Sequence, residues 1–100
     1  MYKGTTPTHY FNVPIDTSRI KELKIVYSQK DKPVLTRRKE DCEIEEGKIT
    51  TTLSQEDTFL FESDKFISIQ MRVLMNEGAC LTSKPLMVSV EKCFDNEVLK

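Results

Sequence analysis

Apolar and polar residues alternate along much of this chain, and the alternation is clearest between Phe66 and Met75. One face of this segment, read as an extended strand, comprises Ile67, Ile69, Met71, Val73 and Met75. The opposite face comprises Ser68, Gln70 and Arg72, with Phe66 and Leu74 at its two ends. A period of two residues is that of a β-strand. The segment therefore predicts a half-buried strand of about ten residues whose outer face is not wholly polar.

The same alternation recurs in shorter segments from one end of the chain to the other. The further predicted strands are Thr8–Val13, Leu23–Ser28, Val34–Arg37, Cys42–Ile44, Ile49–Leu53 and Pro85–Lys92. The turn residues between them lie at Lys30–Pro33, Glu46–Gly47 and Asn76–Gly78. Asn76–Gly78 predicts a hairpin that Ala79–Ser83 continues. Pro85 lacks the N–H that a ladder needs, which places it at a strand start or a sheet edge.

Only two segments favour helix, and each is long enough for a single turn. Asp16–Ile20 begins with residues that cap helices well. Ser54 is followed three residues later by Asp57, which is the spacing of a capping box.

About seven short strands separated by turns are typical of a sandwich or a small barrel. Two sheets are needed because a lone sheet would leave its apolar face in water. We therefore expect an all-β fold, an immunoglobulin-like antiparallel β-sandwich, formed by one domain over residues 1–100 with short tails at 1–6 and 94–100. The expected core comprises Phe11, Ile25, Leu53, Ile67, Ile69, Met71, Val73, Leu86, Val88 and Val90.

Composition narrows the class of protein. With 100 residues, 38% hydrophobic and 31% charged, the chain is an ordinary globular domain with room for one core. Its net charge of −1 argues against a nucleic-acid-binding protein, which usually has a basic excess. No segment approaches the roughly 18 apolar residues of a membrane span, and Met1–Thr8 lacks the apolar stretch of a signal peptide. We expect no membrane association and a cytoplasmic location.

The residues that most often carry chemistry form no recognisable pattern. His9 is the only histidine, and we place it on a strand surface. The three cysteines, Cys42, Cys80 and Cys93, match no zinc spacing. We expect free thiols, with a Cys80–Cys93 disulfide as the alternative. We expect no catalytic residue, no metal, no cofactor and no enzymatic activity.

Two groups of residues are candidates for an interface. The apolar outer-face residues Phe66, Leu74 and Met87 would together form a patch of the kind that marks a contact surface. The basic cluster Arg37, Arg38 and Lys39 is followed at once by two acids. It is typical of a charged edge that prevents strand pairing, and a contact with nucleic acid or an acidic partner is the alternative. Exposed strand edges at Thr8–Val13 and Val34–Arg37 are further docking candidates.

Several segments carry a resemblance to known proteins. Leu53–Thr58 resembles the turn that crosses between the sheets of immunoglobulin-like domains, although the Tyr expected two residues later is Leu60. Over most of its length the chain is similar to small prophage-encoded β-sandwich proteins of gut Firmicutes and to the N-terminal domain of phage baseplate upper proteins. The matching segments are Gly4–Phe11, Ile49–Thr58, Ile67–Gly78 and Val88–Val90.

The resemblance implies a component of a virion or of tail assembly. We therefore expect a non-catalytic structural or interaction module, a phage or prophage tail or baseplate component that acts by self-association or by docking on phage structural proteins. It would be found in the cytoplasm or carried in a phage particle. The alternative is a cytoplasmic ligand- or protein-binding β-sandwich domain unrelated to phage.

Overall fold

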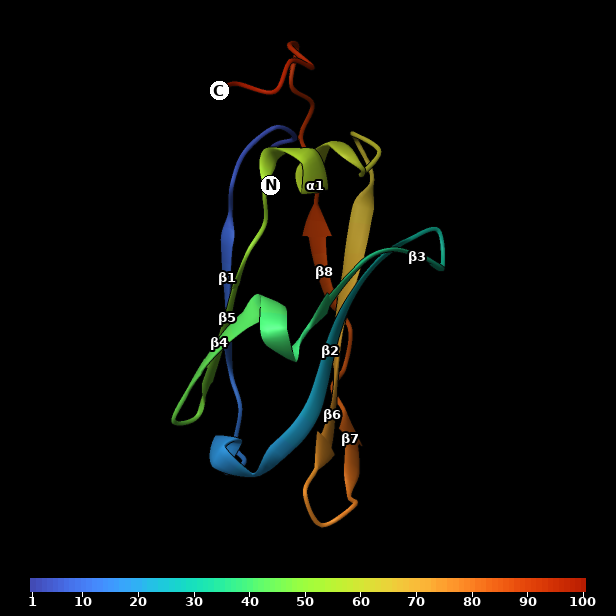
Figure 1. The fold of residues 1–100 in the computed structure, drawn as a ribbon. Coiled ribbons are helices and arrows are strands. Elements are labelled where there is room, and N and C mark those ends of the chain that lie inside the picture. The colour runs from blue at the N-terminus through green and yellow to red at the C-terminus, as the bar shows by residue number, and fades with distance from the viewer.

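The computed structural model describes all of residues 1–100, which form two antiparallel β-sheets packed face to face (Figure 1). The elements in chain order are β1 (Thr8–Asn12), η1 (Thr17–Arg19), β2 (Ile20–Gln29), β3 (Lys32–Arg38), η2 (Lys39–Asp41), β4 (Cys42–Glu45), β5 (Lys48–Thr52), α1 (Gln55–Phe59), β6 (Phe66–Met75), β7 (Cys80–Thr82) and β8 (Leu86–Ser89). The predicted all-β class is confirmed. None of the helices has the length and apolar character that crossing a membrane requires.

The smaller sheet has three strands in the order β1-β5-β4, and the larger has five, with β3-β2-β6 followed by β7 and β8. Both β7 and β8 pair with β6 along the same side, near opposite ends of that strand. They are separated at Ser83, whose N–H donates to the Met71 carbonyl and whose hydroxyl accepts from the Met71 N–H. The chain that follows the predicted hairpin turn thus forms two short strands, β7 and β8. The protein has eight strands, where about seven were expected.

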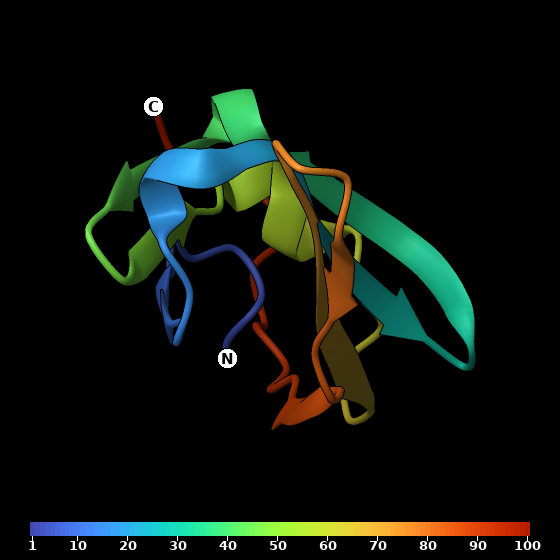
Figure 2. The same ribbon diagram turned by 90° about the horizontal axis from the view of Figure 1, so that it is seen from below.

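Short connections carry the chain between the two sheets. Viewed along the sandwich from below, the sheets form separate layers and α1 lies between them (Figure 2). Both predicted helical turns are present. Asp16 caps η1 through the Ser18 N–H, and Ser54 and Asp57 form a capping box at the start of α1.

The β2–β3 hairpin turns through Lys30 and Asp31, whose positive φ values of 52° and 62° match the turn that suits twisted hairpins.

Most of the predicted core is buried between the sheets. The buried hydrophobic residues are Ile20, Leu23, Ile25, Tyr27, Ile49, Leu53, Phe61, Ile67, Ile69, Met71, Val73, Met75 and Val90. Phe11 and Val88 are half-buried against this cluster. The prediction for Leu86 was wrong, since it is 56% exposed. Leu86 pairs with buried Ile69 but lies on an edge strand, and we attribute its exposure to the narrower opposing sheet, whose three strands do not cover all of the larger one.

The first residues, expected as a tail, pack against the sandwich. Tyr2 bridges to Glu91, and the Glu91 N–H donates to the Met1 carbonyl. The Gly4 N–H donates to the hydroxyl of Thr58, a buried residue of α1. Residues 1–3 therefore lie beside the chain just beyond β8, at the edge of the larger sheet. Gly4 contacts α1 at the same end of the sandwich.

Candidate functional site

Phe66 and Met87 form an exposed apolar pair on the outer face of the larger sheet. Phe66 begins β6, and Met87 of β8 lies opposite Ser68, one diagonal step from Phe66. The Ser68 hydroxyl lies 3.0 Å from the Met87 sulfur. Phe66 is 62% exposed and Met87 58% exposed. We call these two residues the β6–β8 patch.

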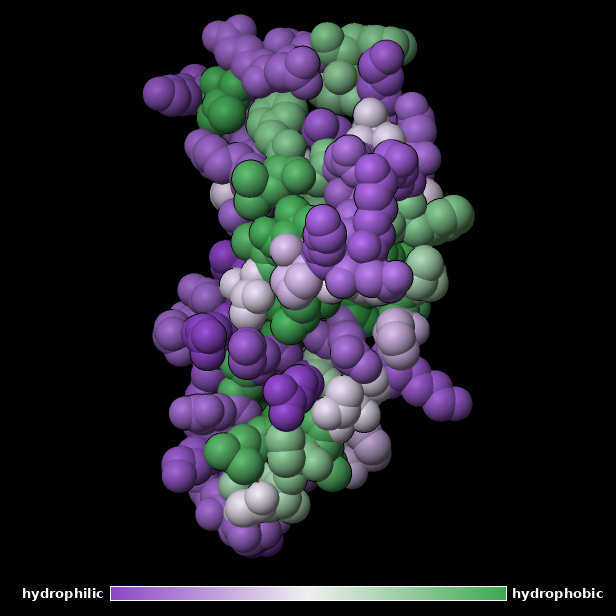
Figure 3. All heavy atoms as spheres, turned by 90° about the vertical axis from the view of Figure 1, so that its right-hand side faces the viewer, coloured by the Kyte–Doolittle hydropathy of each residue, from purple (hydrophilic) through white to green (hydrophobic).

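Leu74, the third apolar candidate, lies apart from this patch. It is eight residues further along β6, which at about 3.3 Å per residue is roughly 26 Å. Leu74 lines a separate hollow of about 160 Å³ with Arg72, Lys24 and Cys80. Figure 3, which looks at this side of the molecule, shows hydrophobic atoms in a larger upper group and a smaller lower one, with hydrophilic atoms between and beside them. The three residues do not make one patch.

The basic cluster does not form a single surface either. Arg37 points between the sheets, where its Nε donates to the Thr51 hydroxyl over 3.2 Å and a terminal nitrogen lies 3.7 Å from the Asp57 carboxylate. Lys39 Nζ donates to the Ile20 carbonyl over 2.8 Å. Only the Arg38 side chain extends into solvent without a partner in the chain. Two of the three cations therefore tie the structure together.

His9 is half-buried and points toward the opposite sheet, whereas it was predicted on a strand surface. Its Nδ1 lies 2.7 Å from the hydroxyl of Tyr27, whose side chain is buried in the opposite sheet. Burial, and to a lesser extent the positive N-terminus, lowers the pKa of His9 below 6.5. Burial also changes the pKa of Tyr27, which it raises, while the positive charge of Arg37 acts to lower it. The only sequence signal for this contact is the shared inward side of His9 and Tyr27 on their strands.

The cysteines are all free. Cys42 is half-buried at the edge of the smaller sheet, and burial raises the pKa of its thiol, while Thr51 and Arg37 act in the opposite direction. A raised pKa leaves less of the reactive thiolate near neutral pH. The Cys93 thiol donates to the Asp95 carbonyl over 3.0 Å. Cys80 is exposed, and its sulfur lies 3.7 Å from a terminal nitrogen of Arg72.

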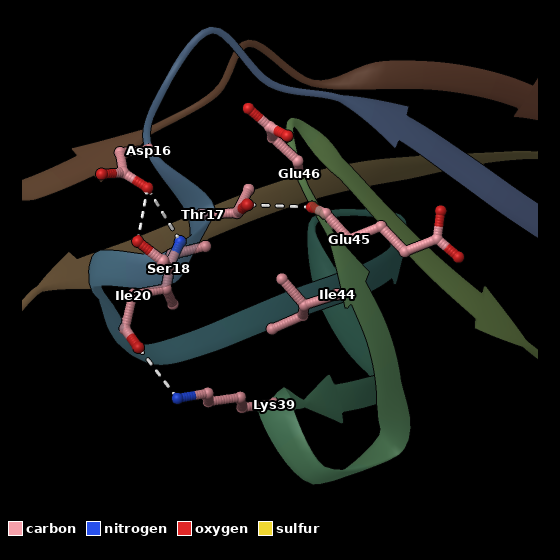
Figure 4. Close-up of a pocket in the computed structure, with 8 residues that line it drawn as sticks. All are labelled: Asp16, Thr17, Ser18, Ile20, Lys39, Ile44, Glu45 and Glu46. Carbon is pink, nitrogen blue, oxygen red and sulfur yellow. Dashed lines mark hydrogen bonds between the residues drawn. The ribbon is translucent and has the colours of Figure 1, made fainter.

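A polar hollow of about 480 Å³ opens where η1, η2 and β4 meet (Figure 4). Its lining residues are Asp16, Thr17, Ser18, Ile20, Lys39, Ile44, Glu45 and Glu46. Asp16 accepts from both the N–H and the hydroxyl of Ser18, which lowers the pKa of its carboxyl. Thr17 donates to the Glu45 carbonyl over 2.8 Å. The Thr17–Glu45 bond joins η1 to β4 of the smaller sheet, while the two Asp16–Ser18 bonds are local to the turn.

The other buried polar side chains also have hydrogen-bond partners. No buried side-chain nitrogen or oxygen lacks a hydrogen-bond partner. No group of three or more His, Cys, Asp or Glu residues is placed to hold a metal ion. The internal bonding of the fold leaves several exposed apolar side chains unexplained, and Phe66 and Met87 of the β6–β8 patch are two of them.

Comparison with protein-family models, with curated proteins and with solved structures finds no match to this chain.

Proposed function

We propose that this chain is a non-catalytic module that docks on another protein, with the β6–β8 patch as its contact surface. The observation that carries the proposal is the exposure of Phe66 and Met87, one diagonal step apart on the same face of the sheet. Contiguous exposed apolar surface marks interaction sites in monomeric proteins. Aromatic residues and methionine are enriched at the centres of interfaces, and the flexible thioether of methionine adapts to different partner surfaces.

The internal arrangement of the polar residues supports a non-catalytic role. Catalysis requires titratable groups that converge on a pocket where substrate can bind. The groups with the most unusual environments, His9 and Tyr27, face each other between the sheets. The largest hollow is lined by side chains and carbonyls that bond to one another.

The identity of the partner is a narrower proposal. The resemblance in Gly4–Phe11 and Ile49–Thr58 supports an immunoglobulin-like tail or baseplate component that meets phage structural proteins, located in the cytoplasm or in a particle. The alternative is a cytoplasmic ligand- or protein-binding domain unrelated to phage. Neighbouring genes distinguish the two, since portal, tail or capsid genes are expected only for the first.

Affinity capture with matched variants tests the docking proposal. A tagged chain is incubated with the purified products of neighbouring genes, alongside a Phe66→Glu/Met87→Glu double variant. Tyr10→Ala is the control, because Tyr10 is also 62% exposed but lies on the smaller sheet. We expect the double variant to lose binding by about tenfold or more, as hot-spot residues do. Equal capture by all three proteins would contradict the assignment of the patch.

A further inference from the structure

The four sheet edges of this molecule differ in how they are protected against pairing with another strand. In native proteins, charged residues, prolines or bulges commonly prevent an edge strand from pairing with another chain. The β4 edge carries Glu43 and Glu45, with Glu46 directly after. The β3 edge contains Lys32 and Pro33, and its register with β2 shifts beside them. Both edges therefore carry devices of this kind.

The edge formed by β7 and β8 is protected in three ways. Ser83 interrupts the pairing with β6, and Lys84 and Pro85 follow it in the middle of the edge. Beyond β8, residues 1–3 already occupy the open side of Glu91, because the Lys3 N–H donates to the Glu91 carbonyl. Little of this edge is free to accept a strand.

Strand β1 itself contains none of these protective features. Thr8–Asn12 contains no Lys, Arg, Asp, Glu, Pro or Gly, and its register with β5 runs without a shift. Pro7 and Pro14 flank it on either side. The side chains of Thr8, Tyr10 and Asn12 are exposed. β1 is a short, regular and uncharged edge.

Two hydrogen bonds fix which backbone groups of β1 are free. The Leu53 N–H donates to the Pro7 carbonyl and the Val13 N–H donates to the Gly47 carbonyl, so both Pro7 and Val13 turn their backbone toward β5. Backbone direction alternates along an antiparallel strand. His9 and Phe11 therefore also face β5, while Thr8, Tyr10 and Asn12 direct their N–H and C=O groups away from the sheet.

We propose that the β1 edge pairs with the β1 edge of a second copy of this chain, in an antiparallel arrangement about a two-fold axis. The inference goes beyond the proposed docking function, because it assigns a second contact surface on the smaller sheet and names a second copy as its partner. Tyr10 lies opposite Tyr10 of the second copy, and Thr8 lies opposite its Asn12. Each outward N–H of one copy then donates to an outward carbonyl of the other. The two smaller sheets become one continuous sheet.

The charges of β1 permit a second copy at this edge, and those of another unpaired edge oppose it. Pairing of β1 with itself sets no charged β1 side chain against another, because the strand has none. The Lys48 ammonium of β5 lies over the Tyr10 ring, 4.7 Å from its centroid. In β4 the outward backbone groups belong to Cys42 and Ile44, because their partners on β5, Thr51 and Ile49, turn their own backbone groups toward β1. Antiparallel self-pairing there would set Glu43 opposite Glu43, and like charges directly opposite destabilise a sheet.

Sedimentation velocity of three proteins tests the proposal. The wild type is measured from about 1 μM to about 1 mM, a range that spans micromolar affinities. Tyr10→Pro removes the central outward N–H but no hydrogen bond to β5, and proline is tolerated at such edge positions. Tyr10→Ala keeps the N–H and loses only the side chain. We expect a concentration-dependent dimer for the wild type and for Tyr10→Ala, and a folded monomer for Tyr10→Pro.

Amide hydrogen exchange of the wild type gives a readout that does not depend on how the proline variant folds. The amides of Thr8, Tyr10 and Asn12 are expected to become protected as concentration rises, while those of His9 and Phe11 are protected throughout. A wild type that stays monomeric to about 1 mM, or a dimer that survives Tyr10→Pro, would overturn the β1 proposal. Capture that still depends on the β6–β8 patch would leave the proposed function standing. Loss of dimer in Phe66→Glu/Met87→Glu would instead place the self-contact on that patch.

Discussion

His9, Tyr27 and Arg37 come from three different strands and join the two sheets through side-chain hydrogen bonds. His9 on β1 meets Tyr27 on β2, and Arg37 on β3 reaches Thr51 on β5. Buried polar groups are tolerated only where they are bonded. These contacts therefore favour one particular placement of the sheets, because any sliding of one over the other would separate the partners.

The single histidine makes the stability of the chain depend on pH in a defined direction. The pKa of His9 is lowered in the folded state, mainly by burial, so the unfolded chain binds a proton more readily. Stability is then complete above about pH 6.5 and declines as the pH falls through the folded-state pKa. We expect urea unfolding to give a lower free energy at pH 5.5 than at pH 7.5. In His9→Asn, which keeps an acceptor near Tyr27 but does not titrate, this decrease should be smaller. An equal decrease in both proteins would show that His9 does not cause it.

Arg37 and Arg38 are adjacent in the sequence but should differ in their effect on stability. Arg37→Ala removes bonds to Thr51 and Thr52 and the ion pair with Asp57. Its loss should lower the unfolding free energy by about 1.5–3 kcal/mol, the range for hydrogen bonds to a charged group. Arg38→Ala keeps the backbone bond to Asp41 and should change it by no more than about 0.5 kcal/mol. Chemical denaturation distinguishes the two, and similar effects would refute the structural role of Arg37.

The roles of His9 and Arg37 could not be predicted from the sequence. His9 was placed on a strand surface because no second His and no Cys lies near it in the sequence, and Arg37 was placed at a charged edge as part of the basic cluster. Their partners are Tyr27 and Thr51, which lie 18 and 14 residues away in the chain and in the opposite sheet. Such contacts depend on how the sheets are stacked, which local alternation does not specify.

At the scale of elements, alternation predicted the strands well where both neighbours of a strand are present. In β6, which lies inside the larger sheet, the inward residues are buried throughout. In β8 the same alternation places Leu86 inward, yet it is exposed because an edge strand has a neighbour on one side only. Capping spacing also predicted α1, because its Ser54 and Asp57 contacts are local. The N-terminal residues were missed because their partner, Glu91, is at the other end of the chain.

Ile69 and Leu86 are paired on neighbouring strands and provide a direct test of this account. Ile69 is 2% exposed and Leu86 is 56% exposed. Ile69→Ala should destabilise the fold by about 2–5 kcal/mol, as truncations in a packed core do. Leu86→Ala should cost less than about 1 kcal/mol, since most of its surface already faces water. Thermal or chemical unfolding measures both, and the reverse order would mean that the larger sheet is covered differently.

At the scale of the whole molecule, the sandwich is long and thin. Its Cα atoms extend over 47 × 30 × 16 Å, and the shortest extent is little more than the roughly 10 Å between two packed sheets. A body of this shape has a large surface for its core. Its distinctive features lie outside the core, in the β6–β8 patch on one sheet and the uncharged β1 edge on the other.

The central claim, that the chain acts by docking proteins on its outer surface, is tested most directly by mapping the contact with nuclear magnetic resonance. Isotopically labelled chain is titrated with the protein captured from the neighbouring gene products, and amide shifts are followed residue by residue. The account predicts shifts that concentrate around Phe66, Ser68 and Met87 on the outer face. Shifts centred instead on the hollow beside Asp16 and Lys39, or the absence of any shift at saturating partner, would contradict it.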